Sequence, residues 1–250
     1  MAEVLIVGMG QVGRAIQAAF TGVHTMSFKD LNDNPLPKNV DVMHICLRYD
    51  TMDDDKFLKT VLGYAREVKP KMIDICSTVA PGTSEYIELR TGIPTMHSTT
   101  RGLHPRIDLR KITKHIGGPE AGRLAEIYNQ AGVPTITHKS ARTTELAHIL
   151  NNLAYGVNLV LADELQSICR DYGVDYFEAV MLYTKTNNQG FEAMDNPTKV
   201  RMILTPPGGV LGGHCVVQSA NLLEKHVLDK STFAKVVAGY GTKAPVITKK

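Results

Sequence analysis

Short apolar runs alternate with amphipathic stretches over the first 140 residues of the chain. Apolar runs of this length are typical of buried strands, and apolar residues at a 3.6-residue period are typical of helices. The runs expected to be strands are Glu3–Val7, Val23–Phe28, Val40–Leu47, Lys71–Cys76, Pro94–His97, Thr113–Gly117 and Pro134–Thr137. Because alternating strands and helices with short connections form parallel sheets, we expect residues 1–140 to form an α/β domain with a doubly wound parallel sheet of the Rossmann type.

One long helix is expected over residues 143–172. Its apolar positions run from Leu146 to Ile168 close to the helical period, and Gly173 follows as a stop signal. At the usual rise per residue, a helix of this length spans roughly 45 Å, which is longer than a typical domain helix. We expect it to be the central helix of a smaller all-α domain, residues 141–250.

A loop and further helices are expected after the long helix. The helices are Tyr176–Thr184, Val216–Val227 and Ser231–Ala238, and a segment rich in glycine and proline precedes the second of them. Cys215 stands at the exit of this segment, where the start of a helix favours the thiolate form. Cys215 is therefore a candidate nucleophile, or alternatively a small core residue, and His214 beside it is a candidate substrate contact.

A glycine-rich turn follows the first expected strand directly. Its sequence is Gly8-Met9-Gly10-Gln11-Val12-Gly13, and a helical pattern starts at Arg14. In this context Gly8 allows a tight turn, Gly10 lets the backbone approach a pyrophosphate, and Gly13 allows close packing of helix on strand. The helix N-terminus then donates hydrogen bonds to phosphate oxygens. All six residues are candidate contacts of a dinucleotide cofactor.

Other strand ends complete the expected cofactor site. Asp30, about 20 residues past the turn, can accept hydrogen bonds from a ribose diol, which favours NAD. Neighbouring Lys29 leaves NADP open, and Asp30 could instead begin a loop. Leu47 ends the third expected strand and Thr78 follows the fourth, at the edge of the sheet where ligands bind. Thr78 is expected on the nicotinamide side. The alternative is that the hydroxyls of this loop only cap a helix, as Thr83 could for the helix that starts near Ser84.

Two groups of polar side chains are candidates for the chemistry. His148 and Asn152 are four residues apart on the long helix and share one of its faces. Imidazole titrates near pH 6.5, so His148 can be the base that takes a hydroxyl proton, with Asn152 holding the oxygen; the alternative is a hydrogen-bonded core histidine. The other candidates are expected to contact an anionic part of the substrate, or to form a solvated loop: His97, Arg101 and His104.

Composition narrows the class of protein. The 250 residues carry a net charge of +3 with no clustered basic stripe, so we expect no nucleic-acid partner. No apolar run is long enough to span a membrane, and a strand begins where a signal peptide would lie, so we expect no membrane partner. The four cysteines have no paired spacing, which indicates neither a disulfide framework nor a metal site. A reducing cytoplasm is the simplest compartment.

Taken together, four motifs resemble those of the nucleotide-sugar 6-dehydrogenases, which act on UDP-glucose, UDP-N-acetylmannosamine or GDP-mannose. The motifs are the turn Gly8–Gly13, the loop STVAPGT at Ser77–Thr83, the helix start ELAHILNN and GGHC at Gly212–Cys215. The resemblance covers nearly the whole chain. It implies an NAD-dependent oxidoreductase acting on a CH–OH group, and a homodimer formed through the central helix. In that family two NAD oxidise a primary alcohol of the sugar to a carboxylate.

The resemblance carries over unevenly to individual residues. The positions that match are Cys215 on the nucleophile, Asn152 on the helix asparagine and Thr78 on the nicotinamide-side threonine. His148 stands where the family has lysine, Ser219 where it has aspartate, and Thr100 where it has glutamate. We also expect a form without the family's C-terminal nucleotide-binding domain, because the sequence ends soon after the Cys215 helix.

Three functions are compatible with these residues. The first is an NAD-dependent dehydrogenase of a sugar or sugar-nucleotide-like alcohol that uses His148 and Cys215. The second is a smaller two-electron hydroxyacid or alcohol dehydrogenase in which Cys215 is structural. The third is a regulatory protein that binds NAD without catalysing a reaction. The missing carboxylates favour a two-electron oxidation at least as much as full oxidation to the acid.

Overall fold

The computed structural model describes residues 1–30, 35–49, 54–101, 108–208, 211, 214–226 and 232–242. The chain divides into two compact units, Met1–His148 and Ile149–Lys250. The sequence places the boundary slightly earlier, at residue 140. The fold of each unit follows from its own sequence pattern.

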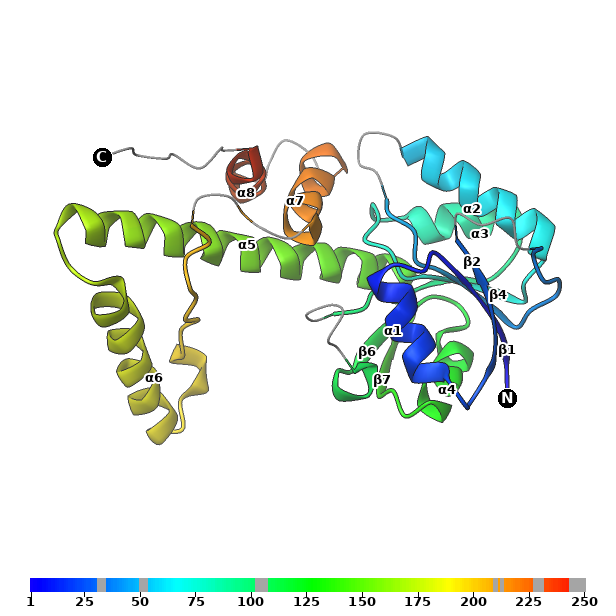
Figure 1. Ribbon diagram of the computed structural model, residues 1–250, viewed down its shortest axis with the longest axis horizontal. Coiled ribbons are helices and arrows are strands. Elements are labelled where there is room, and N and C mark those ends of the chain that lie inside the picture. Colours follow the sequence, from blue (N-terminus) through cyan, green and yellow to red (C-terminus); the bar gives the residue numbers. More distant parts are fainter. Residues whose placement is uncertain are drawn as a thin grey trace. The chain divides into compact units, whose positions relative to one another are not determined.

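The first unit is built on a seven-stranded sheet (Figure 1). Its strands are β1 (Glu3–Val7), β2 (Thr25–Lys29), β3 (Val42–Ile45), β4 (Met72–Ile75), β5 (Thr95–His97), β6 (Lys114–Gly117) and β7 (Thr135–His138). They lie in the order β2-β1-β3-β4-β5-β6-β7, so the direction of winding changes between β1 and β3. The predicted Rossmann-type fold is confirmed.

One detail of the predicted sheet is wrong. All neighbouring strands are parallel except β5 and β6, which are antiparallel. A parallel strand needs a crossover connection, usually a helix. The described residues between β5 and β6 contain no crossover helix, only the 3₁₀ turn η1 (Leu109–Lys111), in agreement with the antiparallel pairing.

Four helices flank the sheet. They are α1 (Gln11–Phe20), α2 (Asp54–Val68), α3 (Thr83–Thr91) and α4 (Ala121–Gln130). α1 and α4 cover one face, and α2 and α3 cover the other (Figure 1). Successive side chains of a strand point to opposite faces of the sheet, and helices cover both faces. The buried strands are therefore largely apolar on both sides. Val4 and Ile6 of β1 pack in the core below α1 and α4, with Phe20 of α1.

The long helix α5 (Ala141–Asp171) confirms the prediction and begins two residues before residue 143. Glu145 lies in its second turn. The Glu145 carboxylate accepts hydrogen bonds from the backbone N–H groups of Gly82 (2.6 Å) and Ser84 (2.9 Å). Glu145 thus caps α3, and the alternative that Thr83 provides this cap is wrong, because the Thr83 hydroxyl donates to a carbonyl within its own loop.

The second unit is helical, as expected. Besides the later part of α5 it contains α6 (Tyr183–Ala193), α7 (His214–His226) and α8 (Thr232–Thr242), with the π-helical segment η2 (Phe177–Leu182) and the 3₁₀ turn η3 (Pro197–Lys199). Its core joins Leu159 and Val160 of α5 with Val216 of α7 and Val237 of α8.

Two features of this unit were outside the predictions. The helix expected at Tyr176–Thr184 continues to Ala193, because the polar residues after Thr186 form an exposed helix without an apolar stripe. Gly156 of α5 also lies against the other helices in this core. Within the described parts of the chain, no helix is long and apolar enough to cross a membrane.

Candidate active site

The glycine turn after β1 has the geometry that a pyrophosphate requires. Gly8 adopts a positive φ of 93°, and a Cβ there would lie 2.7 Å from the carbonyl oxygen of Cys46. A Cβ on Gly13 would lie 2.1 Å from the carbonyl oxygen of Gly8. Gly10, at the N-terminus of α1, faces open space instead. The turn is therefore closed where helix and strand pack and open where phosphate oxygens would approach.

The other expected cofactor residues lie along the same edge of the first unit. Asp30 is exposed and directly follows β2, whose Lys29 carbonyl accepts a hydrogen bond from the Gly8 N–H at 2.8 Å. A Cβ on Gly8 would lie 3.2 Å from a methyl group of Leu47. This edge contains the switch point between β1 and β3, where ligands bind in doubly wound sheets. Three further residues of the turn lie beside it, Met9 and Val12 partly buried and Gln11 exposed.

Thr78 and His148 meet in the first unit. The Thr78 hydroxyl and Nε2 of His148 are 3.1 Å apart. Burial lowers the pKa of His148, the positive charges of Arg101 and Lys114 lower it further, and together they bring it to about 4. His148 is therefore neutral at pH 7, so its ring nitrogen is free of a proton to begin with, but the same causes make it a weaker base than an ordinary imidazole. The residue expected on the nicotinamide side thus contacts the candidate base.

The cationic residues expected after β5 have different surroundings. Arg101 is exposed and donates a hydrogen bond to the carbonyl of Thr113 at 2.7 Å. His97 is fully buried, and its Nδ1 lies 2.9 Å from the Thr144 hydroxyl of α5. Burial lowers the pKa of His97 to about 3. Because the imidazole of His97 is enclosed and neutral, it indicates a structural role for this residue and not contact with an anion. His104 lies outside the described residues.

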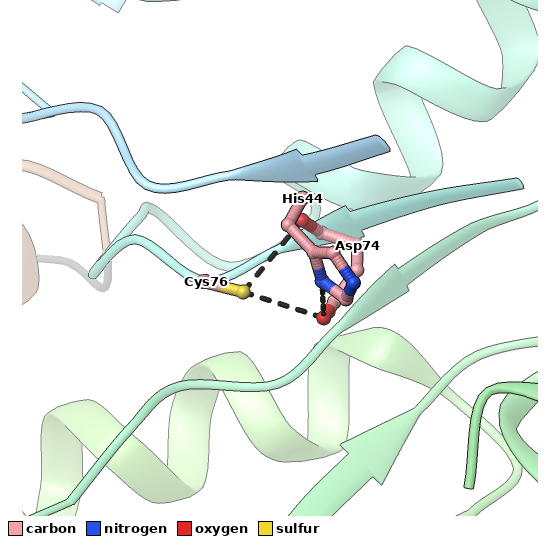
Figure 2. A group of neighbouring side chains, drawn as sticks. All are labelled: His44, Asp74 and Cys76. Atoms are coloured by element: carbon pink, nitrogen blue, oxygen red, sulfur yellow. Dashed lines mark hydrogen bonds and ion pairs between the residues drawn. The ribbon is translucent and has the colours of Figure 1, made fainter. Parts of the chain in front are cut away.

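A buried polar network lies within the first unit, and Figure 2 shows His44, Asp74 and Cys76 close together in it. His44 of β3 and Asp74 of β4 are partners in the sheet register, and their side chains are 2.8 Å apart. Asp74 also accepts hydrogen bonds from Tyr128 at 2.9 Å, from Ser98 at 2.5 Å and from the Cys76 thiol at 3.3 Å. All these side chains are buried and bond to one another in place of water, although Nε2 of His44 has no hydrogen-bond partner among the described residues.

Asp74 sets the charge states in this network. Burial alone would lower the pKa of His44, but the hydrogen bond and charge of Asp74 raise it to about 9. Burial alone would raise the pKa of Asp74, but His44, Lys114 and the Ser98 hydroxyl lower it to about 2. The pair is therefore ionised at neutral pH. Burial and the neighbouring Asp74 charge raise the pKa of the Cys76 thiol.

His44, Asp74 and Cys76 are the described residues whose ligand atoms come close enough to hold a metal ion. Each of the three is already hydrogen-bonded within the network, and the Lys114 ammonium lowers the pKa of Asp74. A neighbouring positive charge disfavours a cation, so we interpret the cluster as a hydrogen-bonded core network.

The remaining candidates belong to the second unit. The Asn152 amide donates a hydrogen bond to the Ser219 hydroxyl at 3.0 Å. Cys215 is exposed in the first turn of α7, one turn before Ser219. The backbone of His214 begins α7, and its side chain is outside the described part of the structure. The structure thus joins Asn152 to Ser219, which the family resemblance aligns with an aspartate.

Sequence reasoning missed Lys114, Glu145 and the His44–Asp74 pair. One signal was available: charged or polar residues interrupt strands that otherwise read as continuous apolar runs, as in VMHI and MIDI. In a strand buried on both faces such residues need partners. Their partners come from distant segments, and the pattern along one strand does not identify them.

Comparisons with curated proteins find dehydrogenases that are similar to most of this chain. No protein-family model matches the chain. A UDP-N-acetyl-D-mannosamine dehydrogenase of Methanocaldococcus jannaschii is 27% identical over 220 residues, 80% of this chain and 47% of the relative. The enzyme of that name from Pyrococcus horikoshii is 28% identical over 206 residues, 74% of this chain and 46% of the relative. The chain therefore spans about half the length of the curated relatives it matches.

Solved structures extend the likeness to most of the chain. The structure of UDP-D-ManNAc dehydrogenase from Pyrococcus horikoshii has a TM-score of 0.77 at 21% identity and covers 96% of this chain and 68% of that one. A 3-hydroxyisobutyrate dehydrogenase from Mycobacterium tuberculosis has a TM-score of 0.70 at 14% identity, covering 96% of this chain and 92% of that one. At such identities the structures show the shared fold.

Proposed function

We propose that this chain, a relative of the nucleotide-sugar dehydrogenases that matches the N-terminal part of those proteins, is an NAD-dependent dehydrogenase acting on a CH–OH group. The relatives agree with the resemblance predicted from the four motifs. The cofactor is NAD, because the glycine turn is open at Gly10 and Asp30 stands beside it for the ribose.

The contact between Thr78 and His148 carries this proposal. It places a neutral imidazole in the same unit as the glycine turn, next to the threonine of the STVAPGT loop. Bound NAD would supply the acceptor for the hydride that leaves the substrate carbon. His148 accepts the hydroxyl proton through its ring, and the Thr78 hydroxyl holds the ring in place. Asn152 is the candidate for orienting the substrate oxygen.

The substrate proposed is an anionic sugar nucleotide. Arg101 is exposed and close enough to His148 to lower its pKa, so it offers a guanidinium near the candidate base. Guanidinium groups bind phosphate and carboxylate oxygens in pairs. The relatives act on UDP-N-acetyl-D-mannosamine by name, which makes that compound the first substrate to try.

A two-electron oxidation that stops at the carbonyl is the second candidate. Its support is the hydrogen bond from Asn152 to Ser219, because a serine stands where the resembling family has a carboxylate. Without carboxylates at Ser219 and Thr100, hydrolysis of a thioester on Cys215 lacks an evident base. In this candidate Cys215 has no covalent role.

Turnover of UDP-N-acetyl-D-mannosamine with NAD tests the proposal. We expect NADH to form, and we expect His148→Gln to lower kcat/KM by about 10²-fold or more, since a general base contributes on that order. His226→Gln, which replaces an exposed histidine of α7, is the matched control and should keep wild-type turnover. Full activity of His148→Gln would remove His148 from the role of base.

The number of NADH formed per sugar separates the two candidates. Two equivalents, lost in Cys215→Ser but kept in Cys169→Ser, support oxidation to the acid through a thiohemiacetal. One equivalent, unchanged in Cys215→Ser, supports the two-electron reaction. Tight NAD binding with no NADH formation from a broad panel of sugar nucleotides and hydroxyacids would contradict both and support a silent NAD-binding protein.

A further inference from the structure

Two cysteines that are far apart in the sequence face each other at the ends of neighbouring strands. β3 and β4 are parallel and stay in register up to the last residue of each strand. Cys46 and Cys76 are the residues that come next. The two segments remain paired beyond them, because the Ser77 hydroxyl donates a hydrogen bond to the carbonyl of Leu47 at 2.5 Å. Cys46 therefore lies opposite Cys76.

Both thiols point to the same face of the sheet. Side chains two positions apart in a strand share a face. His44 and Asp74, two positions before the cysteines, meet at 2.8 Å, and Figure 2 shows Cys76 on the side of that pair. Cys76 is a member of the core cluster below α1 and α4, and Cys46 packs against that cluster. Burial raises the pKa of the Cys76 thiol, and the neighbouring Cys46 thiol raises it further.

This arrangement satisfies the geometric requirement of a disulfide. Neighbouring strands are about 4.8 Å apart, and the Cα atoms of two linked cysteines are usually about 4.4–6.8 Å apart. Opposed residues on one face of neighbouring strands therefore need little backbone movement to form the bond. The spacing of the cysteines along the chain does not reveal this pairing, since it arises from the order of the strands.

The backbone of Cys46 supports the glycine turn. Its N–H donates a hydrogen bond to the carbonyl of Val7 at 2.8 Å. A Cβ on Gly8 would lie only 2.7 Å from the Cys46 carbonyl oxygen, so turn and strand end are in close contact. A disulfide holds its two Cβ atoms about 3.8 Å apart, which is closer than the spacing of the strands. Closing it shifts the end of β3, and the turn has to move with it.

We propose that Cys46 and Cys76 are a site of oxidative modification, at which a peroxide closes a disulfide that weakens dinucleotide binding at the glycine turn. Disulfides in reducing compartments are usually transient and redox-sensing, which fits a pair of this kind. The chemistry of the thiols does not depend on the function proposed above. The effect on binding rests on that proposal for the identity of the cofactor.

The reaction takes two electrons from the thiols and gives them to the peroxide. Cys46 reacts first because it is partly exposed, whereas only 3% of Cys76 is exposed. Its sulfur attacks hydrogen peroxide, the O–O bond breaks, and Cys46 becomes a sulfenic acid as one water leaves. The Cys76 sulfur then attacks the Cys46 sulfur. The S–S bond forms, the S–O bond breaks, and the hydroxyl leaves as a second water with the proton of the Cys76 thiol.

Mass spectrometry after treatment with hydrogen peroxide tests the bond. The Cys215→Ser chain is used, because the exposed thiol of Cys215 also reacts with peroxide. We expect the tryptic peptides 39–48 and 72–90 to be joined, with the mass of their sum less two hydrogen atoms, and to separate in dithiothreitol. Adding Cys169→Ser should leave the joined peptides in place, whereas adding Cys46→Ser should abolish them.

Titration of NADH fluorescence in the same chain measures the effect on binding. Oxidation should raise the Kd for NADH by about fivefold or more, the lower end of typical couplings between two sites, and dithiothreitol should restore it. With Cys46→Ser added, peroxide should leave the Kd unchanged. Cys76→Ser serves the same purpose if the first variant fails to fold, because a serine hydroxyl can also donate to Asp74.

Two results would overturn the proposal. One is an oxidised chain in which the peptides 39–48 and 72–90 stay separate, a result that needs no substitution in the pair. The other is a complete disulfide with an unchanged Kd for NADH. If the disulfide forms but the reduced chain binds no NADH, the proposed function fails together with the effect on binding, while the assignment of the modification site stands.

Discussion

The imidazole of His44 and the carboxylate of Asp74 are enclosed on all sides by the first unit. Removing both charges from water costs several kcal/mol, and their mutual attraction repays this only when the remaining polar atoms are also bonded. Asp74 meets that condition with Ser98, Tyr128 and Cys76 around it, whereas Nε2 of His44 has no partner among the described residues. At the scale of single residues, the stability of the first unit therefore depends on this pair keeping its charge.

The charge of His44 gives a pH dependence with a definite sign. Because its pKa rises from 6.5 to about 9 on folding, the folded state binds the proton more tightly than the unfolded chain. The stabilisation is fully present below pH 6.5 and is lost as the pH rises through about 9. At about 1.36 kcal/mol per pKa unit it amounts to about 3 kcal/mol. Urea unfolding between pH 6 and pH 10 should show this loss.

A matched pair of variants assigns the loss to His44. His44→Gln should lower the free energy of unfolding at pH 6 and flatten its dependence on pH up to pH 10. His226→Gln, at an exposed position of α7, should keep the wild-type curve. A curve for His44→Gln that still falls as steeply as that of the wild type would show that another group is responsible.

At this scale the conformation of the glycine turn was easier to predict from the sequence than the surroundings of the candidate base. Gly8, Gly10 and Gly13 form a local motif whose conformation depends on a few neighbouring residues. The surroundings of His148 come from four separate segments, which contribute Thr78, Arg101 and Lys114 besides the helix itself. Such a neighbourhood depends on the topology of the sheet, so the spacing of residues along the chain cannot predict it.

At the scale of elements, Gly156 decides how closely three helices of the second unit pack. A Cβ there would lie 2.7 Å from a methyl group of Val216 in α7 and 2.8 Å from one of Val237 in α8. Contacts this short force neighbouring side chains to shift. A glycine in the middle of a helix normally costs stability, so its presence in α5 reflects this packing.

Gly156→Ala should therefore destabilise the protein, by about 1–3 kcal/mol as for other overpacked cores. Gly63→Ala is the matched control, because Gly63 lies within α2 with open space around its Cα. That variant should gain about 0.5–1 kcal/mol from helix propensity. Thermal unfolding of both variants measures the difference. Equal melting temperatures for the two would contradict the packing explanation.

The positions of the strands were predicted from the sequence more accurately than their directions or the length of every helix. β1 has the predicted bounds, and the other strands differ only at their ends, because a buried strand leaves a clear apolar run. The direction of β6 was mispredicted, since an apolar run carries no sign of strand direction. The length of the helix in the region of α6 was underestimated, because the surface of α6 is polar on most sides.

At the scale of the whole molecule, one stripe of α5 is left exposed by the described part of the chain. Leu150, Leu161 and Ile168 are 47–52% exposed, and their spacings of eleven and seven residues place them on one face of the helix. Exposed apolar stripes of this kind mark interaction surfaces. We propose that a second copy of the chain covers this stripe, as the family resemblance predicts.

Leu161→Glu combined with Ile168→Glu should convert a dimer into a monomer in analytical ultracentrifugation, because two carboxylates on the stripe would be buried without partners. Leu89→Glu replaces a leucine of α3 that is 83% exposed and should leave the mass unchanged. A monomeric wild-type chain, or a double variant that remains dimeric, would contradict the proposal.

The cap that Glu145 places on α3 has a consequence for protein engineering. Glu145 and His148 lie on the same helix, and each contacts the loop before α3 or its first residues: Glu145 through the amides of Gly82 and Ser84, His148 through Thr78. Helix and loop therefore form one module. A chimera that imports α5 from another dehydrogenase must import the donor's residues 77–84 as well, because a helix grafted alone would leave both partners mismatched.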